Sequence, residues 1–247
     1  MPQPTGKSSA LDKLGLHRPE LRAWAMYDWA NSAYWTTIIA AVFPNYFNRV
    51  VAADMPATVA TTRFAWATTI AVAIVALITP VLGAIADQAA LKKRMLGLFL
   101  GIGVLSTAAL WFVDRGDWVL GLLLFVIGNI GAAGSLSFSD SLLPHIASAD
   151  EVDRVSTAGY AIGYLGGGLL LALNLAWIVK PALFAIADEQ TAVRLSFVSV
   201  AVWWAVFSIP ILRRVPEPTA RHEASDLVAG NVVTGAFIRL GRTLHEL

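Results

Sequence analysis

The stretch Trp118–Phe138 reads WVLGLLLFVIGNIGAAGSLSF and contains no charged residue. An α-helix rises about 1.5 Å per residue, so about 20 apolar residues cross the roughly 30 Å hydrocarbon core of a bilayer. Five other stretches have a comparable length and apolar character. They are Ala23–Phe47, Phe64–Ala86, Met95–Val113, Ser156–Val179 and Leu195–Leu212. The sequence therefore predicts six membrane-spanning helices.

The composition supports this interpretation. The 247 residues are 57% hydrophobic and only 14% charged, whereas soluble domains average about 45–50% apolar and about 25% charged residues. Buried helices of a large soluble protein would need polar helix surface elsewhere in the chain, and this sequence lacks it. The net charge of +1 offers no basic face for nucleic acid. A soluble enzyme and a nucleic-acid-binding protein are both excluded.

Cofactor and metal sites have little support in the sequence. There is no cysteine, and the four histidines are scattered over different polar segments, so we predict no metal site and no cofactor. The run Gly163–Gly168 resembles a phosphate-binding loop, but it lies inside an uncharged apolar stretch and follows no strand. Glycines at helical spacing instead indicate close helix packing in lipid. The glycines concerned are Gly97, Gly101, Gly128, Gly131, Gly134, Gly159, Gly163 and Gly167.

The distribution of basic residues predicts the orientation in the membrane. Of the 18 Lys and Arg residues, thirteen lie in the amino-terminal segment, at residues 92–94, at Arg154 and beyond residue 212. Because cytoplasmic loops are rich in Lys and Arg, both termini are predicted to be cytoplasmic. We divide the chain into a cytoplasmic tail (1–22), a six-span bundle (23–212) and a cytoplasmic linker with an amphipathic helix (213–247).

Asp28 is the one charged residue inside the six stretches. Charges within membrane spans are costly, so each is a candidate functional residue. Helical spacing places Asp28 on one face with Trp24, Asn31, Ser32 and Trp35. The functional interpretation is a substrate or proton pathway formed by Asp28, Asn31, Ser32 and Trp35. The alternative is a structural carboxylate held by the positive end of the helix dipole and by interfacial water.

Asp140 lies at the carboxyl end of the fourth span, where a carboxylate opposes the helix dipole and needs a partner or water. The loop Lys92–Arg94 lies on the same side of the membrane, so we favour a latch between Asp140 and this loop over a proton relay. Gly83 would permit a close helix crossing there, and Asp87 could form an ion pair across the turn.

The alternative for the three basic residues is anchoring to lipid headgroups. Ser148–Glu151 has the spacing of a capping box, so the fifth helix is expected to begin before its apolar run. Arg154 then faces the same cytoplasmic surface. The predicted cytoplasmic gating cluster comprises Gly83, Asp87, Lys92, Lys93, Arg94, Asp140 and Arg154.

Gly83 and Asp87, followed by Lys92–Arg94, resemble the signature loop of the major facilitator superfamily, although residues 88, 90 and 91 depart from its usual pattern. Further segments are similar to vacuolar amino-acid effluxers linked to autophagy and to their bacterial relatives. These segments are Tyr27–Ala33 with Phe43–Pro44, Leu142–Pro144, and Arg154–Ser156 with Gly163–Gly168. That family has asparagine at the position of Asp140, so no family role is transferred to this residue.

The resemblance implies an all-α membrane protein with six transmembrane helices that form one half of a major facilitator fold. Its partners would be the lipid bilayer, a small-molecule solute and a missing carboxyl-terminal six-span half. Amino acids are the implied solutes, moved by alternating access in which the first and fourth spans line the cavity. The membrane would be the cytoplasmic (inner) membrane of a bacterium or the vacuolar membrane of a fungus.

Two other function classes remain open from the residues themselves. A membrane enzyme would need several catalytic groups that converge near an interface, and the chain offers only Asp28 and Asp140. A non-transporting scaffold or partner-binding subunit would use the six-helix bundle as a platform. We expect a transporter rather than an enzyme.

Overall fold

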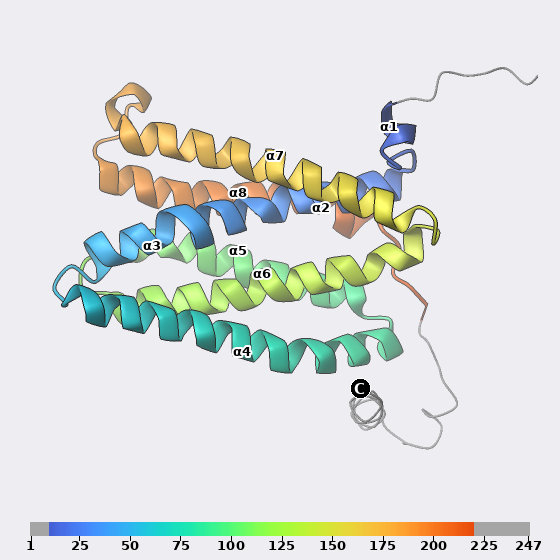
Figure 1. Cartoon of the computed structure of the whole chain (residues 1–247), viewed down its shortest axis with the longest axis horizontal. Helices are drawn as coiled ribbons and strands as arrows, with labels where there is room; N and C mark the ends of the chain where they lie inside the picture. Colours follow the sequence, from blue (N-terminus) through green and yellow to red (C-terminus); the bar gives the residue numbers. More distant parts are fainter. Residues whose placement is uncertain (1–9, 220–247) are drawn as a thin grey trace, which may run out of the picture.

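Long antiparallel helices form an elongated bundle in the computed structural model, which describes residues 10–219 (Figure 1). Within that range there is no β-strand. The elements in chain order are α1 (Ala10–Lys13), α2 (Pro19–Ala33), η1 (Tyr34–Val42), α3 (Phe43–Tyr46), η2 (Phe47–Val51), α4 (Ala57–Ala89), α5 (Lys92–Ala109), η3 (Leu110–Phe112), α6 (Trp118–Ile146), α7 (Val152–Val179), η4 (Pro181–Phe184) and α8 (Glu189–Arg214).

Six helical paths correspond to the six predicted spans. Five of them, α4 to α8, are long and apolar enough to cross a membrane within the described residues. The first predicted span lies in the uninterrupted helical path from Pro19 to Val51, which α2, η1, α3 and η2 make together. The predicted all-α class is therefore confirmed, and the bundle agrees with one half of a major facilitator fold.

The first span departs from a regular α-helix around Pro44. Both η1 and η2 are π-helical, with α3 between them. Proline lacks a backbone N–H and clashes with the preceding turn inside an α-helix. Pro44 closely follows the π-helical segment that ends at Val42, and π-helical turns are irregularities that occur inside otherwise continuous helices. The proline is therefore accommodated without a break in the span.

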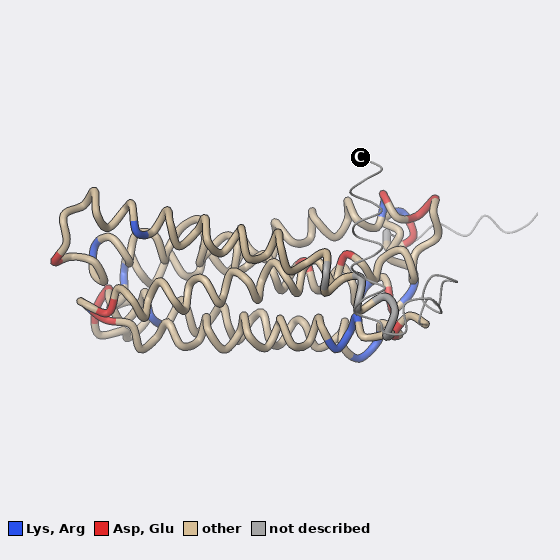
Figure 2. Tube along the Cα trace, turned by 90° about the horizontal axis from the view of Figure 1, so that it is seen from below, with Lys and Arg blue, Asp and Glu red and all other residues tan. Residues whose placement is uncertain are grey.

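The helices pack as neighbouring pairs, and α5 is drawn behind α6 in Figure 1. Helix α2 packs on α7 and α8, and α6 packs on α5 and α4. Charged residues gather at the two ends of the bundle, and the long middle carries few (Figure 2). This is the distribution expected of a protein whose middle lies in lipid.

The loops that are predicted to be cytoplasmic lie together at one end of the bundle. The start of α2, the α4–α5 turn, the α6–α7 turn and the end of α8 lie at one end (Figure 1). We call it the cytoplasmic end, after the predicted orientation, and the opposite one the outer end. The predicted amphipathic helix lies outside the described residues, as do Arg221, Arg239 and Arg242.

Glycine allows two helix pairs to approach closely. A Cβ on Gly131 of α6 would lie 2.5 Å from the Cα of Gly103 on α5 and 2.8 Å from the carbonyl oxygen of Phe99. On α7, a Cβ on Gly167 would lie 2.8 Å from the carbonyl oxygen of Ser32. Backbone therefore packs directly on backbone, which is the main source of helix association in lipid.

Six of the eight predicted packing glycines lie at close contacts, and Gly97 and Gly101 do not. Gly101 and Gly83 have no neighbouring atom within 4 Å of an added Cβ among the described residues, and Gly97 meets only Leu212, at 3.9 Å. The predictions of close packing at Gly101 and of a close crossing at Gly83 are therefore wrong for this bundle. Sequence reasoning overlooked Gly103 and Gly166, which do lie at close contacts.

We predict that Gly131→Ala destabilises the protein and that Gly101→Ala does not. The new methyl group at residue 131 meets backbone, which cannot rotate away as a side chain can, so α5 and α6 must separate. Overpacking of this kind costs about 1–3 kcal/mol. Thermal unfolding in detergent measures the effect, and equal melting temperatures for the two variants would contradict the contact.

Topology can be tested with single cysteines, since the chain has none of its own. Thr58 and Ala187 are exposed at the outer end, and Ala149 is exposed at the cytoplasmic end. Cysteines at residues 58 and 187 should react with an impermeant maleimide in intact cells, and a cysteine at residue 149 only after permeabilisation. The reverse pattern would invert the assigned orientation.

Candidate functional site

Asp28 lies inside the bundle, where α2 meets α7. Only 7% of the residue is exposed. A Cβ on Gly159 of α7 would clash with the Asp28 Oδ2 atom and with the Trp24 ring. Gly159 therefore provides the space that the carboxylate occupies, and the helix contact holds Asp28 away from lipid.

The carboxylate of Asp28 is incompletely compensated. Its Oδ2 atom is buried and has no hydrogen-bond partner among the described residues, and no Lys, Arg or His of residues 10–219 forms an ion pair with it. A buried carboxylate without a partner is costly. Such a carboxylate is stabilised most by a cation or a proton that binds from outside the bundle.

A second carboxylate acts on this site. Asp140 of α6 is exposed and interacts electrostatically with Asp28. Tyr160 of α7 is 58% exposed and lies within electrostatic reach of both carboxylates. Three helices therefore place two acidic groups and one phenol within electrostatic reach of one another near the cytoplasmic end of the bundle.

The other predicted pathway residues divide into two groups. Asn31 is buried, accepts a hydrogen bond from Trp35 Nε1 at 2.5 Å and donates one to the Tyr27 hydroxyl at 3.3 Å. Ser32 faces α7, where a Cβ on Gly163 would lie 2.6 Å from its hydroxyl oxygen. Asp28 and Ser32 therefore both contact α7, whereas Asn31 and Trp35 form a hydrogen bond with each other.

The predicted gating cluster has different partners from those expected. Lys92 is 7% exposed, donates to the carbonyl oxygen of Ser141 at 3.2 Å and lies 2.9 Å from His145 Nε2. Asp140 forms no ion pair with any Lys or Arg in residues 10–219. The expected latch between Asp140 and the basic loop is therefore not formed in this structure, and Lys92 bonds to the adjoining turn of α6 instead.

The remaining cluster members are only partly connected. The backbone N–H of Lys93 donates to both carboxylate oxygens of Glu217, at 3.0 and 3.2 Å. Arg94 and Arg154 are exposed. The side chain of Asp87 lies outside what the structure describes.

Glu151, which the sequence marked only as part of a capping box, is an anionic centre at the cytoplasmic end. Arg18 lies 2.9 Å from its carboxylate, and His17 lies 3.6 Å away. The Ser148 hydroxyl and backbone N–H donate to Glu151 Oε2 at 2.6 and 3.1 Å. Helix α7 begins at Val152, before the apolar run, as the capping-box spacing predicted.

At the outer end, a second network of ion pairs and hydrogen bonds joins the helices, and the sequence did not predict it. Arg194 of α8 lies 2.7 Å from the Asp114 carboxylate and donates to the Tyr46 hydroxyl at 3.1 Å. Tyr46 in turn donates to the carbonyl oxygen of Val113 at 2.7 Å. Arg115 pairs with Asp54. These contacts connect α3, the α5–α6 loop and α8, so the outer ends are fixed relative to one another.

Comparison with known proteins gives the family. The sequence profile described as vacuole effluxer Atg22 like matches residues 50–247, most of the chain. The chain belongs to this Atg22-like family. It is an integral, multi-pass membrane protein of a transporter family, and the resemblance inferred from its motifs is confirmed.

The Atg22-like chain is also similar to a protein of Bacillus subtilis (strain 168) described as the uncharacterized MFS-type transporter YxiO. The two are 32% identical over 227 residues, which is 91% of this chain and 52% of the relative. The chain thus spans about half the length of the curated relative that it matches. No solved structure matches it at a significant level.

The Glu151 cluster predicts a stability that depends on pH. Hydrogen bonds from the Ser148 side chain and backbone, together with the charges of Arg18 and His17, lower the pKa of Glu151 from 4.5 to about 2. The contribution to stability is therefore complete above pH 4.5 and is lost as the pH falls toward 2.

Thermal unfolding of wild type and Glu151→Gln across this range measures the contribution. We expect the gap between their melting temperatures to be constant at neutral pH and to close in acid. Asp150→Asn removes a neighbouring exposed carboxylate and is the control. A gap that stays unchanged down to pH 2 would mean that the charge of Glu151 contributes nothing.

Proposed function

We propose that this chain is the amino-terminal half of a secondary transporter that moves small solutes by alternating access against a second six-span half. Membership of a transporter family, the apolar helices and the twofold length of the Bacillus relative support the proposal. Transporters of this architecture place their binding sites at mid-membrane between halves that rock against each other. Amino acids are the first solute class to test, since the family resemblance implies them.

The observation that carries the proposal is the buried, uncompensated carboxylate of Asp28. Its 7% exposure and unpartnered Oδ2 atom are costly to stability, which favours a functional role over a structural one. Asp28 would bind a proton or the ammonium group of a solute, and the nearby Asp140 would strengthen the attraction for either cation. Asn31, Ser32 and Trp35 would line the same pathway.

The cytoplasmic cluster would influence the rocking motion. Gly83, Asp87, Lys92, Lys93, Arg94, Asp140 and Arg154 are proposed to belong to this gate. Exposed ion pairs contribute only about 0–1 kcal/mol each, but conformations of a transporter differ by only a few kcal/mol. Ion pairs that this cluster forms with the second half would therefore favour one conformation, whereas the contact of Lys92 with α6 lies within this half. We assign the protein to the cytoplasmic membrane in a bacterial host and to the vacuolar membrane in a fungal one.

The substitution Asp28→Asn tests the proposal in the complete gene product reconstituted into proteoliposomes. It retains the size of the side chain and removes its charge. We expect solute movement, measured across a panel of amino acids with and without a proton gradient, to fall by about tenfold or more. Insertion into the membrane and the melting temperature should be retained.

Asp153→Asn is the matched control, since Asp153 is an exposed carboxylate at the first turn of α7. It should transport like wild type. Unchanged transport by Asp28→Asn would return Asp28 to a structural role. A wild-type protein that moves no solute of the panel would contradict transport of amino acids and favour a scaffold.

A further inference from the structure

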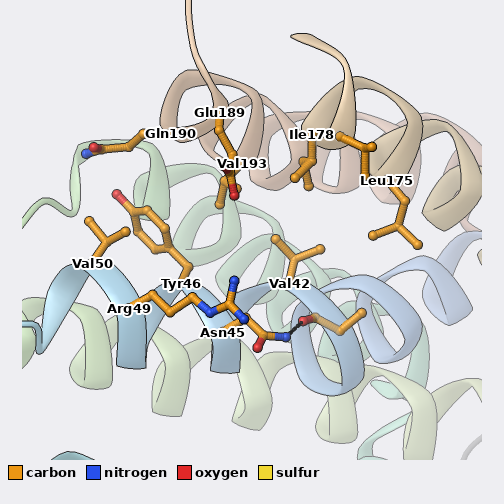
Figure 3. Close-up of a pocket in the computed structure, with 12 residues that line it drawn as sticks. Val42, Asn45, Tyr46, Arg49, Val50, Leu175, Ile178, Glu189, Gln190 and Val193 are labelled. Atoms are coloured by element: carbon orange, nitrogen blue, oxygen red, sulfur yellow. Dashed lines mark hydrogen bonds between the residues drawn. The ribbon is translucent and has the colours of Figure 1, made fainter.

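A pocket of about 490 Å³ opens near the outer end of the bundle, away from Asp28. One wall comes from the first span, through η1, α3 and η2, and the other comes from α7 and α8 (Figure 3). A volume of this size holds a small organic molecule. None of the residues singled out from the sequence lines it.

The two walls carry opposite charges. Arg49 extends along the floor of the pocket beside Asn45, and the carboxylate of Glu189 points down from α8 toward it (Figure 3). Among the described residues, neither Arg49 nor Glu189 forms an ion pair. The pocket therefore presents a cation and an anion that are both available to a ligand.

Polar and apolar groups complete the lining. Asn45 donates its amide to the carbonyl oxygen of Ala41 at 2.7 Å, which leaves its own carbonyl oxygen free to accept a hydrogen bond. Val42, Leu175, Ile178 and Val193 supply apolar surface between the charged groups. A few converging polar groups on an apolar wall are typical of small-molecule sites.

We propose that this pocket binds a small zwitterion, with its carboxylate at Arg49, its ammonium group at Glu189 and an apolar side chain against Val42 and Ile178. An arginine guanidinium pairs well with a carboxylate, and Glu189 accepts from an ammonium group. A ligand with one charge alone would use only one of the two charged side chains. The occupant is an apolar α-amino acid at the outer entrance, which rests on the proposed transport function.

A phosphatidylethanolamine headgroup has the same chemistry, since it carries an ammonium group and a phosphate. The pocket lies where the outer leaflet would be, so the experiment must separate the two sources. Reconstitution into phosphatidylglycerol vesicles, with and without phosphatidylethanolamine, does so because only the second preparation offers the zwitterionic headgroup.

Binding of radiolabelled L-leucine to the complete gene product in phosphatidylglycerol vesicles tests the site. Arg49→Gln and Glu189→Gln should each weaken binding by about tenfold or more, because each removes a charge-assisted contact. Lys180→Gln removes an exposed cation at the same end and should leave binding unchanged.

Two leucine analogues distinguish loss of a contact from structural damage. Leucinamide lacks the carboxylate, so its weak binding should be insensitive to Arg49→Gln. The anion 4-methylpentanoate lacks the ammonium group and should be insensitive to Glu189→Gln. Damage to the fold would weaken every ligand in both variants, and that result would overturn the assignment of the two charges.

Failure of this inference differs from failure of the proposed function. Unchanged leucine binding in both variants, or no leucine binding by wild type, would overturn the assignment of the pocket as an amino-acid site. The proposal that the protein transports other solutes would be unaffected. Leucine binding that disappears when phosphatidylethanolamine is added would show that the lipid headgroup occupies the pocket. It would overturn the proposal that a free amino acid is the occupant. Loss of transport in Asp28→Asn is independent of all these results.

Discussion

The close approach of α2 and α7 is the constraint on which the candidate site depends. Four glycines of α7, at residues 159, 163, 166 and 167, leave space for the side chains and backbone of α2, so the two helices approach closely. In lipid there is no hydrophobic force between helices, so such backbone contact and its dispersion energy hold them together. The same contact encloses Asp28. A larger residue at position 159 would therefore disturb both the packing and the carboxylate.

The two ends of the bundle are fixed in a different way from its middle. At the outer end, Arg194 joins Tyr46 to Asp114, and at the cytoplasmic end Glu151 holds Arg18. The middle is joined by glycine contacts and apolar side chains. A bundle connected at both ends and along its length can rotate as a unit, which the proposed alternating access would require of each half.

The sequence predicted the helices well because the length of an apolar stretch can be read locally and compared directly with the thickness of the bilayer. Asp28 was found for the same reason, since a charge within a span is conspicuous. The partners of the charged side chains were less predictable. Lys92 was expected to meet Asp140 but bonds to Ser141 and His145, and Arg194 pairs with residues distant in the chain. Such pairings depend on the rotation of each helix about its axis, which periodicity leaves loosely determined.

The glycines show the same limit. Gly101 and Gly103 have similar surroundings in the sequence, yet only Gly103 lies at a contact. The π-helical segments around Pro44 were also not predicted. A proline in a span indicates a local adjustment, but its form depends on how neighbouring helices pack. Element type and burial of a charge are therefore readable from the sequence, and helix-to-helix register is not.

The most direct test of a buried, reactive Asp28 is carbodiimide modification of the complete protein in membranes, with the modified residues identified by mass spectrometry. Dicyclohexylcarbodiimide is apolar and reaches carboxyl groups inside membrane proteins, whereas a water-soluble carbodiimide reaches exposed ones. Asp28 should react with the apolar reagent and only slowly with the water-soluble one, which should readily modify exposed Asp153. Reaction of Asp28 with the water-soluble reagent and resistance to the apolar one would place its carboxylate in bulk water and contradict this account.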